Sequence, residues 1–305
     1  MELLTHLSLI QKNIRFLKNY RRLREDMLNP APPWEELRRY LREEEGLFYQ
    51  EFCERREGLR QEQENLQQLM VQGVRFTFPG DSLFPSAFCG MPGAPVFLSF
   101  KGHPAWQTGP CLAVVGSREP SSLSHLWMEE HLMKFLEREA VVLVSGGARG
   151  IDQMAHQLAL RKSRPTVVVV PSGLGRLYPQ NLEAWQGKII EGGGCLLSEY
   201  PFAERMQKHF FHDRNRLIAG LGLLTLLVEA RRRSGSLLTA QKTLQLGKCV
   251  LVLPGHPCES SHLGNLDLLS EGATPVRDAE DLSMYFRSEL NSLSFLPSID
   301  SDSSR

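Results

Sequence analysis

Short apolar runs alternate with helical patterns from residue 111 onward, and this alternation constrains the fold more than any other feature. The runs occupy residues 111–115, 140–144, 166–170, 195–198, 223–229 and 248–253. Helical periodicity lies between and after them, near residues 122–139, 151–160, 181–191, 214–219 and 237–246. Strands that are apolar nearly throughout and are separated by helices form a parallel sheet covered on both faces. We therefore predict a Rossmann-like, doubly wound α/β domain with a mostly parallel sheet.

The first 72 residues differ in character from the rest of the chain. They are rich in Leu, Arg, Glu and Gln, with helical periodicity over 7–23 and 34–70 and a proline-rich break at 29–33. The final residues are instead polar and rich in serine. We predict three parts: a small all-helical module at 1–72, the Rossmann-like domain at 73–285 and a disordered tail at 286–305.

Charge and composition exclude several classes of protein. Because 35 Lys and Arg balance 35 Asp and Glu, overall charge cannot attract nucleic acid, and such a role needs local clustering. The apolar runs are too short to span a bilayer, and residues 1–17 lack a secretory signal pattern. The six cysteines are scattered and have no metal-ligand spacing. We expect a cytoplasmic protein without membrane contact, metal or cofactor.

A glycine-rich segment, Ser-Gly-Gly-Ala-Arg-Gly-Ile-Asp, occupies residues 145–152 between an apolar run and a helical pattern. Such a turn lets backbone N–H groups approach an anion, and the helix N-terminus and Arg149 add positive charge. Ser145, Gly146 and Arg149 are therefore candidate phosphate contacts. The alternative is that the glycines serve only the geometry of the turn.

Other loops leave the same edge of a parallel sheet. They carry Gly116, Ser117 and Arg118 after the first apolar run, and an Arg-Arg-Arg-Ser-Gly-Ser segment at 231–236. Guanidinium, hydroxyl and N–H donors suit phosphate oxygens better than a carboxylate or an apolar ligand. The sequence predicts a phosphate-binding crevice at this edge.

Basic and aromatic residues interleave over 208–216, where Lys208, Phe211, Arg214, Asn215 and Arg216 stand out. Cations that follow the backbone and rings that stack on bases are typical of single-stranded nucleic-acid binding. Two alternatives remain open. At least one of Phe210 and Phe211 is expected to pack in the core, and the arginines could instead form salt bridges with Asp213, Glu199 or Glu229.

No residue is identified as catalytic. Asp152, at a helix start, is more simply explained by a bond to a neighbouring loop, and Glu229 by pairing with the three arginines that follow it. No serine lies in a Gly-x-Ser-x-Gly elbow. The sequence predicts a binding protein and not an enzyme.

Collinear motifs cover roughly two thirds of the chain. They are Val-Val-Gly-Ser-Arg-Glu-Pro-Ser at 114–121, the 145–152 segment, Leu-Ser-Glu-Tyr-Pro at 197–201, Arg-Asn-Arg-Leu-Ile-Ala-Gly-Leu at 214–221, Ser-Gly-Ser-Leu-Leu-Thr-Ala at 234–240 and Val-Leu-Pro-Gly at 252–255. With these motifs the chain resembles the DNA-processing protein A (DprA/Smf) family of bacterial natural transformation.

The resemblance implies a single-stranded DNA-binding mediator that protects incoming DNA and loads the RecA recombinase, as a homodimer and without established catalytic turnover. It assigns DNA contact to the candidates already chosen: Gly116, Ser117, Arg118, Ser145, Gly146, Arg149, Lys208, Phe211, Arg214, Asn215 and Arg216. His212 and Asp213 depart from the family pattern and put an acid beside the proposed site. Apolar residues between Leu282 and Leu290 could supply the dimer interface.

A second hypothesis is a hydrolase that acts on nucleoside monophosphates in the same crevice. It needs a working carboxylate, either Glu199 or Glu229. The Pro-Gly-Gly-x-Gly-Thr element usual in such enzymes is missing from the sequence. We therefore favour the binding protein.

Overall fold

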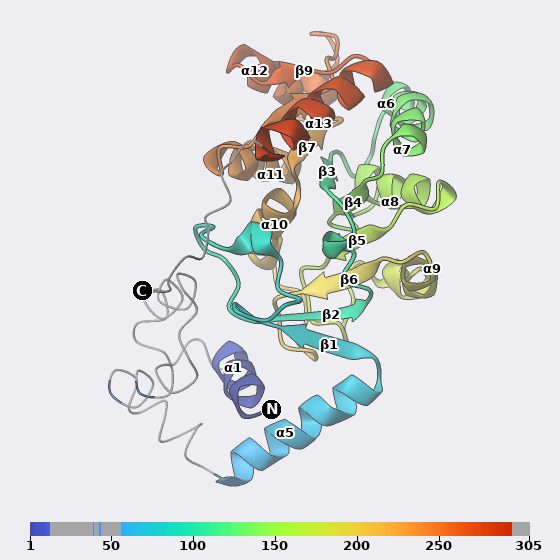
Figure 1. Cartoon of the computed structure of the whole chain (residues 1–305). Coiled ribbons are helices and arrows are strands. Elements are labelled where there is room, and N and C mark those ends of the chain that lie inside the picture. Colours follow the sequence, from blue (N-terminus) through green and yellow to red (C-terminus); the bar gives the residue numbers. More distant parts are fainter. Residues whose placement is uncertain (13–38, 40–42, 44–55, 295–305) are drawn as a thin grey trace.

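A mixed sheet forms the centre of the molecule in the computed structural model, which describes residues 1–12, 39, 43 and 56–294 (Figure 1). Across these residues the sheet has nine strands in the order β1-β2-β6-β5-β4-β3-β7-β8-β9. The strands are β1 (Val74–Thr77), β2 (Leu98–Gly102), β3 (Cys111–Val115), β4 (Val142–Ser145), β5 (Thr166–Val169), β6 (Cys195–Ser198), β7 (Leu224–Leu227), β8 (Val250–Val252) and β9 (Thr274–Pro275).

Seven of these strands, from β6 through β9 in sheet order, pair in parallel, whereas β2 pairs antiparallel with both β1 and β6. The order reverses at β3, which lies between β4 and β7. In open parallel sheets, such a reversal opens a crevice at the carboxyl ends of the strands.

Helices cover both faces of the sheet. Figure 1 shows α8 and α9 on one side and α10 and α11 on the other. The helices are α1 (Glu2–Lys12), α5 (Arg56–Val71), α6 (Ser122–Trp127), α7 (Met133–Arg138), α8 (Ile151–Arg161), α9 (Gln186–Glu191), α10 (Phe210–Leu221), α11 (Gly235–Gln245), α12 (Leu263–Ser270) and α13 (Ala279–Ser294). A π-helical turn at Met128–Leu132 joins α6 to α7.

Alternating residues of β3 explain why the sheet is buried on both faces. Ala113 and Val115 belong to the core under α10, and Leu112 and Val114 to the core under α8. All four are almost fully buried. Burial of the apolar side chains on each face stabilises the fold by about 25 cal/mol per Å² of apolar surface removed from water. The predicted doubly wound, mostly parallel sheet preceded by helices is confirmed.

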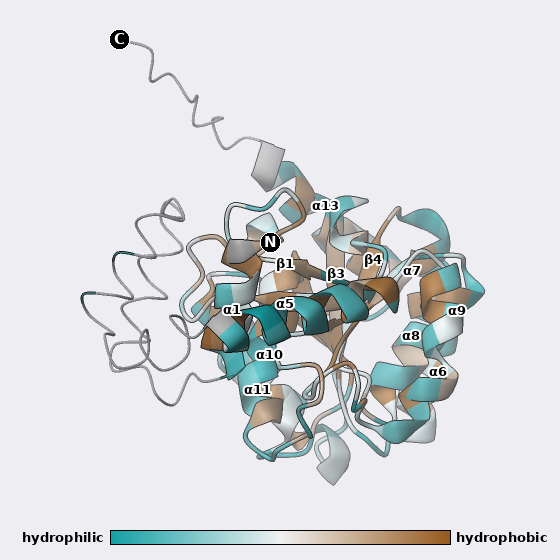
Figure 2. Cartoon of the chain, turned by 90° about the horizontal axis from the view of Figure 1, so that it is seen from below, coloured by the Kyte–Doolittle hydropathy of each residue, from teal (hydrophilic) through white to brown (hydrophobic). Residues whose placement is uncertain are grey.

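The N-terminal helices α1 and α5 pack against each other beside β1. Figure 2 shows the pair from below, with hydrophilic residues along the outward face of α5. Ser8 Oγ donates to Glu62 at 2.6 Å, and Gln11 Nε2 donates to the carbonyl oxygen of Glu199. The helix α1 is thereby joined to the end of β6. Most of the periodicity predicted over 7–23 and 34–70 lies outside the described residues.

The helix α13 corrects the predicted start of the tail at residue 286. It continues to Ser294, and Phe286 is 1% exposed against α7, with its ring 5.4 Å from that of Phe135. Only a few of its side chains, among them Leu282 and Phe286, face the core. Polar residues separate these side chains in the sequence, and for this reason the segment was not recognised as an amphipathic helix. Neither α12 nor β9 was expected from the sequence. No helix in the described part of the chain is long and apolar enough to cross a membrane.

Candidate functional site

A crevice of about 510 Å³ opens where the sheet order reverses. Its walls come from the loops after β3 and β4, the N-terminal half of α10, and the β7–α11 connection. Lining residues include Gly116, Ser117, Arg118, Ala148, Asp152, Lys208, Phe211, His212, Arg214, Asn215, Arg231, Ser234, Gly235, Ser236 and Thr239. Seven of the predicted contacts therefore lie together: Gly116, Ser117, Arg118, Lys208, Phe211, Arg214 and Asn215.

The loops after β3 and β4 lock together through their backbones. Ile151 N donates to Ser117 O at 3.0 Å, at the start of α8. Gly150 has φ +80°, and a Cβ there would lie 2.3 Å from Ser117 O; one on Gly116 would lie 2.7 Å from Ile151 Cγ1. These two glycines are required for the close approach of the two loops. This agrees with the alternative left open by the sequence, in which glycines serve the geometry of the turn.

Asp152 occupies the position in which the sequence predicted an anion. Its Oδ2 accepts hydrogen bonds from Gly146 N at 3.2 Å and Ala148 N at 3.3 Å. Burial raises the pKa of Asp152, whereas the charge of Arg214 and these bonds act to lower it. The N–H groups of Gly146 and Ala148 are thus already bonded within the protein, and contact of Ser145, Gly146 and Arg149 with a phosphate stays a prediction. The loop is held by the protein's own carboxylate, as proposed for Asp152.

Arg214 is a buried cation on the floor of the crevice, 3% exposed. Its Nη1 donates to Val169 O at 2.5 Å, and its charge lies near Asp152. Burial lowers the pKa of Arg214 to about 10. The acids considered from the sequence as partners of the arginines were Asp213, Glu199 and Glu229; the acid whose charge acts on Arg214, Asp152, was not among them.

Arg216 lies on the other side of α10, outside the crevice. Its guanidinium pairs with Glu199 at 2.5 Å, the salt bridge foreseen as an alternative, and its Nε donates to Gly93 O at 2.6 Å. It lines a separate cavity of about 750 Å³ with Phe210 and Tyr200. Residues two apart on a helix point in different directions, so Arg214 and Arg216 cannot share one wall. Asn215 bridges α10 to α11 by donating to Gly235 O at 3.2 Å.

Ser145, Gly146 and Arg149 are not among the residues that line the crevice. Ser145 is buried and donates its hydroxyl hydrogen to Val114 O at 2.6 Å. Gly146 lies under Arg214, and Arg149 is exposed. These three positions thus lie outside the crevice, although the loop that carries them is bonded to the loop after β3.

The exposed cations Arg118 and Lys208 line the crevice together with the partly buried ring of Phe211. Arg118 Cζ lies 5.2 Å from the centroid of that ring, and Tyr178 packs edge-on against it at 5.6 Å. Phe210 instead stacks on Tyr200 at 4.0 Å. Phe211 lies beside a guanidinium in the crevice. Both rings are only partly buried, so the expectation that one of them packs in the core is not met.

The sequence placed the 231–236 segment at this edge but did not include its residues among the predicted DNA contacts. Arg231, Ser234, Ser236 and Thr239 all line it. The signal was present, because the Arg-rich loop leaves the same edge and a Ser-Gly-Ser triplet begins the helix.

Glu229 is not the counter-ion of the arginines that follow it. It is fully buried, and its Oε2 accepts a hydrogen bond from Ser121 N at 2.8 Å. Arg232 pairs instead with Asp267 at 2.7 Å. Within the described ranges, no group of three or more His, Cys, Asp or Glu residues could hold a metal ion.

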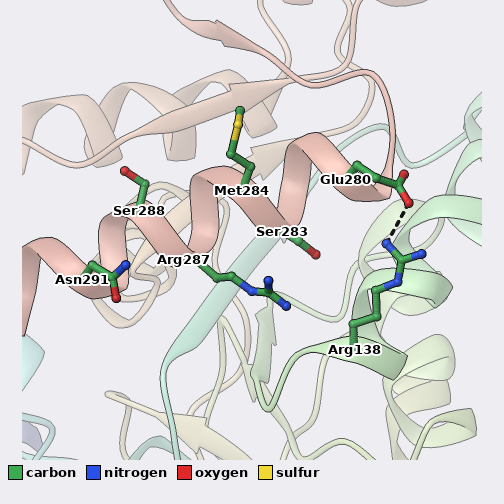
Figure 3. A pocket seen from close by; sticks show the side chains of 7 residues that line it. All are labelled: Arg138, Glu280, Ser283, Met284, Arg287, Ser288 and Asn291. Atoms are coloured by element: carbon green, nitrogen blue, oxygen red, sulfur yellow. Dashed lines mark hydrogen bonds and ion pairs between the residues drawn. The ribbon is translucent and has the colours of Figure 1, made fainter.

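A further hollow lies along α13, shown in Figure 3. The Arg138 guanidinium points at the Glu280 carboxylate, 2.7 Å away, and Arg287 pairs with Glu139 at 2.7 Å. Its charges are thus paired within the protein. The crevice, in contrast, presents exposed cations beside an aromatic ring.

The fold and the crevice define a Rossmann-like protein with a crevice lined by cations at the carboxyl edge of its sheet. A sequence profile of the family described as DNA recombination-mediator protein A matches residues 75–287. The chain belongs to this family, which confirms the resemblance seen in the motifs.

Two curated relatives show how far the similarity extends. The DNA processing protein DprA of Streptococcus pneumoniae is 36% identical over 206 residues, which cover 68% of this chain and 72% of that protein. Protein Smf of Escherichia coli is 37% identical over 175 residues, or 56% of this chain and 46% of that protein. The chain thus spans less than half of the E. coli protein.

Solved structures agree with the fold. The X-ray structure of DprA from S. pneumoniae superimposes with a TM-score of 0.72 at 28% identity, covering 90% of this chain and 94% of that one. DprA from Helicobacter pylori, described for its single-stranded DNA binding mode, gives a TM-score of 0.62 at 28% identity, covering 70% and 97%.

Proposed function

We propose that the crevice binds single-stranded DNA. The observation that carries this proposal is the placement of Arg118 over the ring of Phe211 with Lys208 at the same crevice. Cations contact the phosphates of a strand, and an aromatic ring stacks on a base without reading its identity. The single-stranded DNA binding mode described for the H. pylori relative supports the same ligand class here.

The crevice favours binding over hydrolysis. The hydrolase hypothesis needs Glu199 or Glu229 as a working carboxylate. Glu199 is paired with Arg216 on the other side of α10, and Glu229 holds the backbone of Ser121. Neither carboxylate is among the residues that line the crevice. We therefore propose a protein without catalytic turnover.

We further propose that this protein acts in the cytoplasm as a homodimer, protects incoming DNA and loads RecA on it during natural transformation. Membership of a family of recombination mediators supports this role. The proposed DNA-binding positions are those in the crevice, with Arg214 and Asn215 shaping it from below. Arg216, Ser145, Gly146 and Arg149 are proposed to support the site or to contact DNA beyond the crevice.

The test compares single-stranded with double-stranded oligonucleotides in a binding assay, with and without RecA. We expect a preference for single strands and faster assembly of RecA on strands already bound. Arg118→Gln should weaken binding, whereas Arg161→Gln, which removes an exposed arginine paired with Glu129, should not. Release of phosphate from nucleoside monophosphates, or equal affinity of Arg118→Gln and the parent protein, would overturn the proposal.

A further inference from the structure

The first turn of α11 offers donors to the crevice. Ser234, Gly235 and Ser236 line the crevice, and α11 is 11 residues long. Ser234 is the N-cap residue but makes no side-chain hydrogen bond to the helix backbone; its hydroxyl lies 2.8 Å from Ser236 Oγ. By contrast, Ser121 caps α6 by accepting from Ser124 N. The N-terminus of α11 therefore lacks the side-chain cap that such a residue usually supplies.

Arg231 adds a full charge at the same wall. It is exposed and lines the crevice, whereas the neighbouring Arg232 points elsewhere and forms two bonds with Asp267, at 2.7 and 2.8 Å. No carboxylate in the described part of the chain forms an ion pair with Arg231. The two adjacent arginines thus differ in one respect that matters for an anion: only Arg231 lacks an acidic partner.

Arg214 provides an independent sign of a ligand. It lines the crevice and is 3% exposed, yet its Nε has no hydrogen-bond partner among the residues that the structure describes. Buried donors are nearly always satisfied, by protein, water or ligand. An anionic ligand seated in the crevice would supply the missing acceptor, directly or through a water molecule.

We propose that Arg231, the hydroxyls of Ser234 and Ser236, and the first-turn N–H groups of α11 form a second phosphate subsite. It holds one phosphate of a strand whose neighbouring phosphate contacts Arg118 and Lys208. A helix N-terminus with an adjacent guanidinium is suited to a phosphate group. This inference rests on the proposed function and extends it, because the strand then crosses α10 from the β3 loop to α11.

The test is a salt titration of single-stranded oligonucleotide binding with matched variants. For single strands, each phosphate contact contributes about 0.7 to the slope of log K against log salt concentration. We expect Arg231→Gln to reduce that slope by about 0.7 and to lower the affinity. Arg232→Gln, which removes the same charge one residue away, should leave the slope unchanged.

A second variant separates the subsite from helix stability. Ser236→Asp places a negative charge in the first turn of α11, which favours the helix but repels a phosphate. We expect a melting temperature at or above that of the parent and a clear loss of affinity.

The outcomes distinguish the two proposals. If the parent binds and Arg118→Gln weakens binding, but Arg231→Gln and Ser236→Asp bind like the parent, the subsite is refuted and the proposed function stands. If the parent does not bind single-stranded DNA, both are refuted.

Discussion

The guanidinium of Arg214 lies directly against Gly146. A Cβ built on this glycine would come within 1.7 Å of Arg214 Nη1. The same guanidinium is bonded to Val169 O and lies near Asp152, so it cannot withdraw without losing these interactions. The glycine thus provides the space in which a buried cation holds the floor of the crevice.

Gly146→Ala should therefore destabilise the protein. Displacing a buried, bonded side chain costs about 1 to 3 kcal/mol, as overpacking does generally. Urea unfolding measures the change. The control is Gly187→Ala in α9, where a Cβ would meet nothing within 4 Å and helix propensity should give a gain of about 0.5 to 1 kcal/mol. Equal stability of Gly146→Ala and the parent would contradict the packing described.

The buried His156 is expected to lower the free energy of unfolding in acid. It is fully buried, with Nδ1 2.6 Å from Thr166 Oγ1, and burial lowers its pKa to about 3. Between about pH 6.5 and 3 the unfolded chain binds a proton that the folded chain does not. The free energy of unfolding should therefore fall by about 1.4 kcal/mol per unit as the pH drops through this range.

The check is urea unfolding at several pH values for His156→Gln, which should have a shallower slope below pH 6.5. The exposed His103→Gln should keep the parent slope. A parent slope in His156→Gln would show that this histidine does not carry the effect.

Lys248 closes the C-terminal end of α10. Its Nζ donates to Gly220 O at 2.6 Å and Gly222 O at 2.7 Å, and burial lowers its pKa. Lys248→Met leaves these carbonyls unpaired, so we expect a loss of about 1 to 3 kcal/mol in thermal or urea unfolding. The exposed Lys188→Met should be nearly neutral, and a neutral Lys248→Met would refute the capping role.

Phe211 is expected to contribute to DNA binding, and Phe210 to the stability of the fold. Phe211→Leu removes the ring beneath Arg118, and we expect it to weaken single-stranded DNA binding by about 1 to 3 kcal/mol. Phe210→Leu removes the stack on Tyr200 and should lower stability more than affinity. Fluorescence anisotropy and thermal unfolding of both variants check this, and the reverse pattern would exchange their roles.

The strands were predictable because they are apolar on both faces: the predicted bounds of Cys111–Val115 and Cys195–Ser198 are those observed. Arg118 was predictable because parallel strands place their loops at one edge, and Lys208 and Phe211 because basic and aromatic residues interleave over 208–216. The role of Asp152 as an internal anion depends on how the 145–152 loop folds back on α8. Helical geometry alone separates Arg216 from Arg214, but which of them faces the crevice depends on how α10 is seated. The apolar residues of α13 lie among polar ones, and this amphipathic helix was not recognised.

Arg118 and Lys208 are proposed to contact the phosphates of one DNA strand. The measurement is the salt dependence of single-stranded oligonucleotide binding by the parent and by the double variant Arg118→Gln, Lys208→Gln. Two lost contacts should reduce the slope of log K against log salt concentration by about 1.4 and weaken binding at every salt concentration. A double variant with the slope and affinity of the parent would contradict the claim.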